Sequence, residues 1–369
     1  MKLTIAKEQI ITGLQAVQNV VGTRTTLPIL SNVLLRAEGN RLQLTATDLD
    51  VTISCAVEAQ VSEAGATTLP VKKFFSIVRE MGSLEVDLAV DEKNVCTIQS
   101  GASFFKIHGL AAEEFPPLPL FNETRKIVLP QGKVKGMLRK TSFAVSNDES
   151  RYVLNGLFFS LKDHKLTMVS TDGRRLALAD EEVDVDPANH AEFIVPTKAI
   201  NELSRLLQDQ GEIEIAFIEN QASFTLRDEK GMGILLISKL VDGIYPNYRQ
   251  VIPAESKERV TLVREEFAQA LRRAEIMTSD KANSVKLSFG RNSLSITSNT
   301  PEVGEARENL AINYKGKEFS VAFNPAFLLD ALKALDDDEV YFELTDELSP
   351  GVLKINGPFL CVVMPMRMN

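Results

Sequence analysis

The chain of 369 residues contains no tryptophan, three cysteines and three histidines, and no apolar run approaches the length of a membrane span. Cys55, Cys96 and Cys361 each stand alone in a strand-like run, which favours buried thiols over disulfides or a zinc site. The histidines are scattered and have no companion at metal-ligand spacing. We therefore expect neither a disulfide-stabilised domain nor a metal centre.

The short motifs of common nucleotide-binding and hydrolytic sites are also missing. The sequence has no GxxxxGK[ST] phosphate loop, no GxGxxG opening a helix and no GxSxG nucleophile elbow. Lys7 and Glu8 stand where a signal peptide would need an apolar segment, so we expect a cytosolic protein. The lack of tryptophan and of an aromatic-rich strand disfavours stacking on single-stranded bases.

One pattern is written three times: a strand end, a proline expected at the first helical position, and an amphipathic helix. These prolines, spaced by 126 and 129 residues, are Pro70, Pro196 and Pro325. A second marker closes an apolar strand with a small polar turn, at spacings of 124 and 127, and lies at Asp48, Asp172 and Asn299. A strand followed by a proline and a helix is common in α+β proteins, but the agreement of two markers favours a true repeat.

The repeat predicts an α+β chain of three tandem domains, at residues 1–122, 126–252 and 255–369. Each repeat carries two helices and many antiparallel strands, and the helices should cover one face of each sheet. Neighbouring repeats can share sheet edges, which also removes exposed edges.

Charge is unevenly distributed over the chain, whose net charge is −9. The predicted helices together carry +7 and the remainder −16. The six helices are expected at Lys7–Gly22, Pro70–Met81, Gln131–Ala144, Thr197–Gln208, Arg264–Met277 and Pro325–Leu335. Surface helices often favour Lys and Arg, but Gln131–Ala144 contains no acidic residue, which favours a shared positive face. Such a face on an acidic body would attract a polyanion, and a sequence-independent grip on duplex DNA fits best.

Acidic residues offer the only candidates for catalysis. Asp172 could serve as a carboxylate nucleophile, but Asp48 and Asn299 hold equivalent places, and an Asn there favours turn chemistry. The run beginning at Asp336 could bind a metal ion, although a solvated turn explains it as well. Two rivals to a DNA-binding protein therefore remain: a nucleotide-processing or nuclease enzyme with an acidic site, and a monomeric peptide-binding scaffold.

Several motifs together resemble the bacterial sliding clamps, the beta subunits of DNA polymerase III, and the resemblance runs from Met1 to the C-terminus. Besides the triple repeat, they are Thr171-Asp-Gly-Arg-Arg-Leu176, Leu240-Val-Asp-Gly243, Tyr245-Pro-Asn-Tyr-Arg249 and Val362-Val-Met-Pro-Met-Arg367. The resemblance implies three clamp-fold domains with helices inside and antiparallel sheets outside. It also implies a head-to-tail homodimeric ring around duplex DNA that lends processivity to a polymerase, with no catalysis and no cofactor.

The resemblance further implies that the polymerase, the clamp loader and other partners insert a short peptide into an apolar cleft between repeats two and three. Arg174 and Gln250 stand where some relatives carry His and Arg. The matching cleft positions are Leu154, Thr171, Gly173, Arg174, Arg175, Leu176, Pro246, Val251, Leu348, Val362, Met364, Pro365, Met366 and Arg367.

Contacts with DNA and with the second subunit are implied in the same way. Val153 stands where some relatives carry a second aromatic residue beside Tyr152. The expected DNA contacts are Arg24, Tyr152, Lys73, Lys133, Lys135, Arg139, Lys140, Lys198 and Arg205. The dimer seam is expected at Phe105, Ile276 and Met277, although Phe104 and Phe105 could also be core residues.

Overall fold

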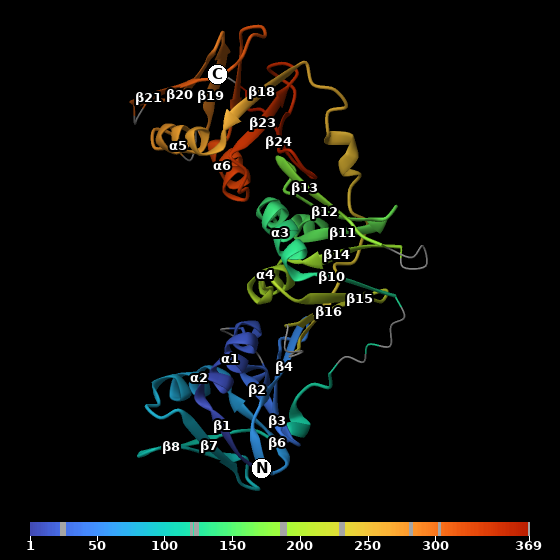
Figure 1. Ribbon diagram of the computed structural model, residues 1–369, viewed down its shortest axis with the longest axis vertical. Coiled ribbons are helices and arrows are strands. Elements are labelled where there is room, and N and C mark those ends of the chain that lie inside the picture. The colour runs from blue at the N-terminus through green and yellow to red at the C-terminus, as the bar shows by residue number, and fades with distance from the viewer. Residues whose placement is uncertain are drawn as a thin grey trace. The chain divides into compact units, whose positions relative to one another are not determined.

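The computed structural model describes residues 1–22, 27–118, 121, 125–184, 190–228, 233–279, 283–301 and 304–367. The chain divides into two compact units (Figure 1). Unit 1 comprises Met1–Lys135 and Lys198–Leu240, and unit 2 comprises Gly136–Thr197 and Val241–Asn369. The division falls inside the second repeat, so each unit combines one outer repeat with part of the middle one.

Unit 1 contains a five-stranded and an eight-stranded antiparallel sheet. The first has the order β5-β1-β7-β8-β9, with β1 (Lys2–Ala6), β5 (Gln60–Glu63), β7 (Glu85–Val90), β8 (Val95–Ser100) and β9 (Ser103–His108). The second has the order β10-β15-β16-β17-β4-β3-β2-β6, with β2 (Asn32–Glu38), β3 (Arg41–Thr47), β4 (Val51–Glu58), β6 (Gly65–Pro70), β10 (Lys126–Pro130), β15 (Glu212–Phe217), β16 (Gln221–Arg227) and β17 (Gly233–Lys239). Because β17 pairs with β4, the eight-stranded sheet joins repeats one and two.

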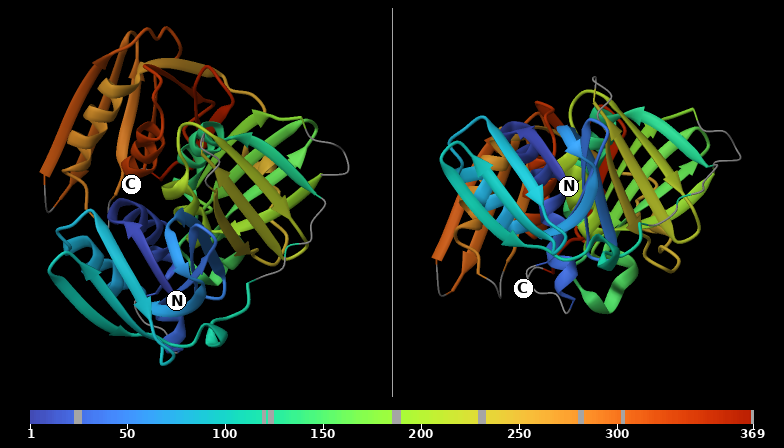
Figure 2. Two further views of the ribbon diagram at one scale, coloured as in Figure 1. Left: turned by 60° about the horizontal axis from the view of Figure 1, so that its bottom comes forward. Right: turned by 90° about the horizontal axis from the view of Figure 1, so that it is seen from below.

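Three helices belong mainly to unit 1: α1 (Lys7–Val17), α2 (Val71–Glu80) and α4 (Thr197–Leu206). Helix α1 contacts β1 of one sheet, β4 of the other sheet, and α2 (Figure 2). Its buried Ile10 and Leu14 lie one turn apart and so face the same core. The apolar face of α1 therefore packs against both sheets.

Unit 2 repeats this plan. Its eight-stranded sheet has the order β14-β11-β12-β13-β25-β24-β23-β18, with β11 (Gly156–Lys162), β12 (Lys165–Thr171), β13 (Arg175–Glu182), β14 (Ala191–Pro196), β18 (Glu258–Val263), β23 (Glu339–Leu344), β24 (Gly351–Lys354) and β25 (Phe359–Val363). Its four-stranded sheet has the order β21-β20-β19-β22, with β19 (Val285–Gly290), β20 (Ser293–Thr300), β21 (Gly304–Ala311) and β22 (Phe319–Phe323). The pairing of β25 with β13 joins repeats two and three.

Helices α5 (Arg264–Glu275) and α6 (Pro325–Lys333) contact each other against these sheets (Figure 1). Phe267 and Leu328 from the helices meet Phe342 of β23 in the core. The division between the units falls within α3 (Gln131–Thr141). In the described ranges, no helix is long and apolar enough to cross a membrane.

Two of the three repeated prolines end a strand rather than open a helix. Pro70 pairs with Asn32 in the β6–β2 ladder, and α2 begins at the next residue. Pro196 ends β14 in the same way, whereas Pro325 is the first residue of α6, capped by the Asn324 side chain. A proline is tolerated at both positions because β6 and β14 are edge strands, where a missing N–H need not break a ladder bond.

The helices predicted at Lys7–Gly22 and Gln131–Ala144 are shorter in the structure. A 3-10 turn at Gln18–Val20 follows α1, and another at Ser142–Ala144 follows α3. The sequence also failed to predict β21, whose polar residues show no apolar alternation because both of its faces are partly exposed. The idea that Phe104 or Phe105 is a core residue was wrong, since both are exposed on the edge strand β9.

Candidate functional site

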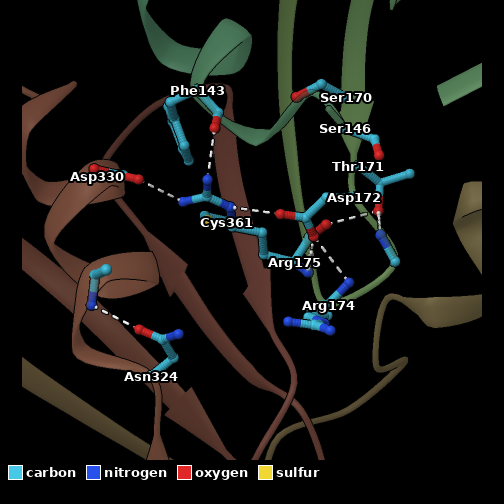
Figure 3. Close-up of polar contacts among 12 residues, drawn as sticks. Phe143, Ser146, Ser170, Thr171, Asp172, Arg174, Arg175, Asn324, Asp330 and Cys361 are labelled. Carbon is cyan, nitrogen blue, oxygen red and sulfur yellow. Dashed lines mark hydrogen bonds and ion pairs between the residues drawn. The ribbon is translucent and has the colours of Figure 1, made fainter. Parts of the chain in front are cut away.

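A tight turn joins β12 to β13 in unit 2 at the predicted cleft (Figure 3). Asp172 Oδ1 accepts hydrogen bonds from the backbone N–H groups of Arg174 at 2.9 Å and Arg175 at 3.0 Å. Thr171 Oγ1 donates to the carbonyl oxygen of Arg175 at 2.6 Å. Gly173 supplies the left-handed conformation that the turn requires, with φ of 83°. Asp172 thus shapes a turn, whereas Asn299 of repeat three lies within β20, where it pairs with Glu305.

The strands that follow this turn form an apolar floor. Leu176 of β13 pairs directly with Val362 of β25, so both side chains lie on the same face of the sheet. They belong to one buried cluster, which consists of Leu154, Phe158, Val169, Leu176, Leu178, Ile194, Tyr245, Val352 and Val362. Three predicted cleft residues, Leu154, Leu176 and Val362, are therefore brought together.

Several predicted cleft residues expose apolar surface instead. Val251, Met364 and Met366 are all large and substantially exposed. The backbone N–H of Met364 donates to the carbonyl oxygen of Arg174 at 2.9 Å, which holds the C-terminal segment against the turn. Pro246, Pro365 and Arg367 are likewise not buried. Buried floor and exposed edge together give an apolar surface with polar groups beside it.

Leu348 stands apart from this cluster. It lies in the turn between β23 and β24, where its N–H donates to Asp346 Oδ1 at 3.0 Å. Its side chain is 82% exposed and is not a member of the buried cluster.

The two neighbouring arginines differ in role. Arg175 is only 10% exposed at its side chain, and its guanidinium bonds to protein groups on three sides (Figure 3). Within the described part of the chain, the exposed guanidinium of Arg174 makes no hydrogen bond or ion pair. Arg174 is therefore available to a ligand, whereas Arg175 is not.

An aromatic group lies behind the cleft, and the sequence analysis assigned no role to Tyr245 or Tyr248. Tyr245 stacks on Phe158 with ring centroids 4.8 Å apart, and Tyr248 tilts against the same ring. The Tyr245 hydroxyl donates to the carbonyl oxygen of Val169, and burial raises the pKa of this phenol. Two tyrosines flanking a proline were the available signal. A cavity of about 410 Å³ lies beside them.

Four of the cations expected to contact DNA are already bonded to protein groups. Lys135 pairs with Asp209 at 2.7 Å, and Arg139 Nη1 bonds to Asp336 Oδ1 at 2.9 Å. The other contacts are Lys198 with Asp48, and Arg205 with Glu202 and the carbonyl oxygens of Gln15 and Ala16. Arg205 thus connects α4 to the end of α1.

The remaining expected DNA contacts are accessible. Lys73, Lys133 and Tyr152 are exposed, and Lys140 is half-buried. Arg24 lies outside the described residues.

The residues expected at the dimer seam border two unpaired sheet edges. Phe105 lies on β9, the edge of the five-stranded sheet. Ile276 follows α5 and is 72% exposed. Met277 lies against Gly304, the first residue of the edge strand β21. Its Cε is only 3.1 Å from the position that a Cβ atom of residue 304 would occupy.

Among the described residues, no group of three or more His, Cys, Asp or Glu side chains could hold a metal ion. Asp336 is bonded to Arg139, whose guanidinium lowers the pKa of that carboxyl. Asp336 is thus paired with a cation of α3.

Comparison with known proteins identifies the class. Family models of the N-terminal, central and C-terminal domains of the DNA polymerase III beta subunit match residues 1–119, 128–247 and 249–367. The protein is thus built from three DNA clamp domains. The chain belongs to the DNA polymerase III beta-subunit family, the beta sliding clamps, which act in DNA replication as non-catalytic processivity factors with DNA and polymerase as partners.

Similar proteins span the full chain. It is 36% identical to the beta sliding clamp of Chlamydia muridarum and 31% identical to that of Bacillus subtilis, with all of both chains covered in each case. A crystal structure of the Bartonella birtlesii sliding clamp bound to griselimycin matches with a TM-score of 0.94 and 34% identity over both whole chains. The Pseudomonas aeruginosa clamp bound to griselimycin matches with a TM-score of 0.94 and 32% identity, again over both whole chains.

Proposed function

We propose that two copies of this chain form a closed head-to-tail ring that encircles duplex DNA without sequence preference. The ring tethers the replicative polymerase, the clamp loader and other proteins through a peptide-binding cleft formed by repeats two and three. The domains span residues 1–122, 126–252 and 255–369, and the protein works in the cytoplasm.

The observation that carries the ring is a rule followed by both internal junctions. At each junction, the last strand of one repeat pairs antiparallel with the strand that follows the polar turn of the preceding repeat. These pairs are β17 with β4 and β25 with β13. The same rule predicts pairing of β9, the last strand of repeat one, with β21 of repeat three. Both strands are sheet edges within the chain, so the partner must come from another copy.

A ring closed by such junctions needs only weak contacts to its DNA. Cations on the helices supply them by neutralising phosphates, which position a duplex without encoding sequence. The ion pairs of Lys135, Arg139 and Lys198 reduce the positive charge available, which favours sliding over tight binding. The exposed Tyr152 is a further expected contact.

The cleft is proposed at the apolar surface of unit 2. Leu154, Leu176 and Val362 form its floor, and the exposed Met364 and Met366 adapt to different apolar side chains. The clamps bound to griselimycin are similar over the whole chain. We therefore propose that griselimycin also binds this chain, and that it binds at this cleft.

Retention on circular DNA tests the ring. The protein is loaded by a clamp loader onto nicked circular DNA and separated by gel filtration, and the DNA is then linearised. We expect retention on the circle and release after linearisation, with a molar mass in solution of two chains. A monomeric peptide-binding scaffold would not be retained on either DNA, and equal retention on both forms would mean ordinary surface binding.

A further inference from the structure

Strand register places the side chain of Arg175 behind the apolar floor rather than in the cleft. In the β13–β25 ladder, Leu176 pairs with Val362 while Arg175 pairs with Val363. Adjacent residues of a strand point to opposite faces, and paired residues share a face. Val362 belongs to the cluster beneath the cleft, whereas Val363 belongs to the core around α5 and α6. Arg175 therefore points toward the helices.

On that side, the guanidinium is bonded in every direction (Figure 3). Its Nε donates to Asp172 Oδ2 at 3.1 Å, and its Nη1 donates to Asp330 Oδ2 at 2.7 Å. Its Nη2 donates to the carbonyl oxygen of Phe143 at 2.8 Å. The guanidinium carbon also lies 4.6 Å from the ring centroid of Phe327 and 5.5 Å from that of Phe143.

These partners come from both sides of the junction between repeats. Asp172 and Phe143 belong to repeat two, whereas Asp330 and Phe327 lie on α6 of repeat three. We propose that Arg175 is a positioning residue of the peptide cleft: by bonding repeat two to α6, it fixes the β13–β25 junction that carries the cleft floor. The proposal rests on the cleft proposed above.

Loss of the Arg175 side chain should loosen the strands that carry the cleft. Asp172 and Asp330, which bond to different nitrogens of the guanidinium, would both lose their shared cation, and a partly buried carboxylate that loses its partner destabilises the structure around it. The strand pair at Arg175 and Val363 lies one residue from Leu176 and Val362, and the bond from Met364 to Arg174 lies one residue to the other side. Floor and edge of the cleft should therefore loosen together.

Griselimycin is the probe, and its affinity and dissociation rate are measured by surface plasmon resonance on the full-length chain. The variants are Arg175→Ala, Arg175→Lys and Asp330→Asn, all at a temperature well below each variant's Tm. We expect Arg175→Ala to weaken binding roughly tenfold, mostly through faster dissociation, and Asp330→Asn to weaken it about threefold. Arg175→Lys keeps the charge but not the planar fork, so partial rescue is expected.

The chain offers two matched controls. Asp336→Asn weakens the ion pair with Arg139, which also joins repeat two to repeat three but is exposed, so griselimycin binding should stay unchanged. Val78→Ala lowers stability from a buried position in unit 1 and should leave the dissociation rate unchanged. A purely structural role would show the opposite: affinity loss would follow the Tm in every variant.

The outcomes separate this inference from the cleft itself. If Val362→Ala and Met364→Ala weaken griselimycin binding but folded Asp330→Asn and Arg175→Ala bind like the wild type, the positioning role is overturned and the cleft stands. If Val362→Ala and Met364→Ala have no effect, or the wild type does not bind, the cleft is misplaced and the inference falls with it. Should Arg175→Ala fail to fold, Asp330→Asn decides the matter, because it keeps the arginine and removes one bond partner's charge.

Discussion

At the scale of single residues, repeats one and two form the same turn with an aspartate at its start, but they differ in the residue at the left-handed position. Asp48 accepts from the N–H groups of Asp50 and Val51, as Asp172 does from the two residues at the equivalent positions. The left-handed position is Gly173 in repeat two but Leu49 in repeat one, with φ of 78°. The aspartate therefore has a structural role in both turns, and glycine suits the left-handed position better than leucine does.

Leu49→Gly should raise the free energy of unfolding by up to about 1 kcal/mol. A left-handed leucine costs about 1–2 kcal/mol, and the greater freedom of glycine in the unfolded chain offsets part of the gain. Little burial is lost because the Leu49 side chain is 45% exposed. Urea unfolding measures the change. Leu84→Gly is the control, since Leu84 is exposed without a positive φ, and equal or larger stabilisation there would contradict the strain argument.

The three cysteines give a prediction for alkaline pH. Burial raises the pKa of each thiol from the ordinary value of 9.0 to about 12. Above pH 9.0 the unfolded thiols ionise while the folded ones keep their protons. Because the folded state then binds more protons, its free energy of unfolding falls as pH rises, by about 1.4 kcal/mol per thiol and pH unit until about 12.

Urea titrations at increasing pH measure the slope of the free energy of unfolding against pH. Cys96→Ala should reduce this slope by the contribution of one thiol. Iodoacetamide should label the native protein only after unfolding. Rapid labelling of the native thiols at neutral pH would show that they are accessible and would refute the buried assignment.

At the scale of elements, apolar periodicity predicted the six helices because each has one face in a core. It failed where tertiary contacts decide. The edge strand β21 has no buried face to pattern it, and the α1 helix ends early in a 3-10 turn although Val20 and Val21 continue the apolar pattern. The side-chain role of Arg175 was also beyond sequence reasoning, because its partner Asp330 lies 155 residues away.

Helix α3 provides a test of which cations grip DNA. Lys135 is paired with Asp209. In the described structure Lys140 makes no direct ion pair and interacts with Asp336 only through a longer-range electrostatic attraction. Lys140→Ala should therefore reduce the slope of log K against log salt by about one, and Lys135→Ala by clearly less. Binding to a short duplex, followed by fluorescence anisotropy across salt concentrations, measures both slopes. If the two variants reduce the slope equally, the ion pair between Lys135 and Asp209 breaks when the protein binds DNA.

The C-terminal segment is a second element with a separable role. Deleting Met364–Asn369 removes the exposed methionines and the bonds to Arg174 and Ala322. We expect griselimycin binding to be lost, while retention on circular DNA persists because no residue of the two edge strands is removed. Normal affinity of the truncated chain would refute the cleft assignment.

At the scale of the whole molecule, sequence markers gave three repeats but not how they join. The compact units cut across the middle repeat because its strands divide between two eight-stranded sheets, each completed by an outer repeat. Such pairing joins residues far apart in sequence, as with Ile53 and Leu236. Spacing alone carries no signal for it. The shared junction rule is what turns a linear chain of repeats into a candidate ring.

That rule makes the seam between copies the most informative place to perturb. Ile276→Ala combined with Met277→Ala removes two large apolar side chains beside β21 while leaving the strand itself intact. Each truncation at a buried contact costs about 1–2 kcal/mol, so the dimer dissociation constant should rise roughly a hundredfold. Sedimentation velocity over a range of concentrations should show monomer replacing dimer, and retention on circular DNA should fall in parallel. Leu84→Ala, at an exposed leucine that lies on neither β9 nor β21, should leave both unchanged. A double variant that still sediments as the wild type would place the seam elsewhere.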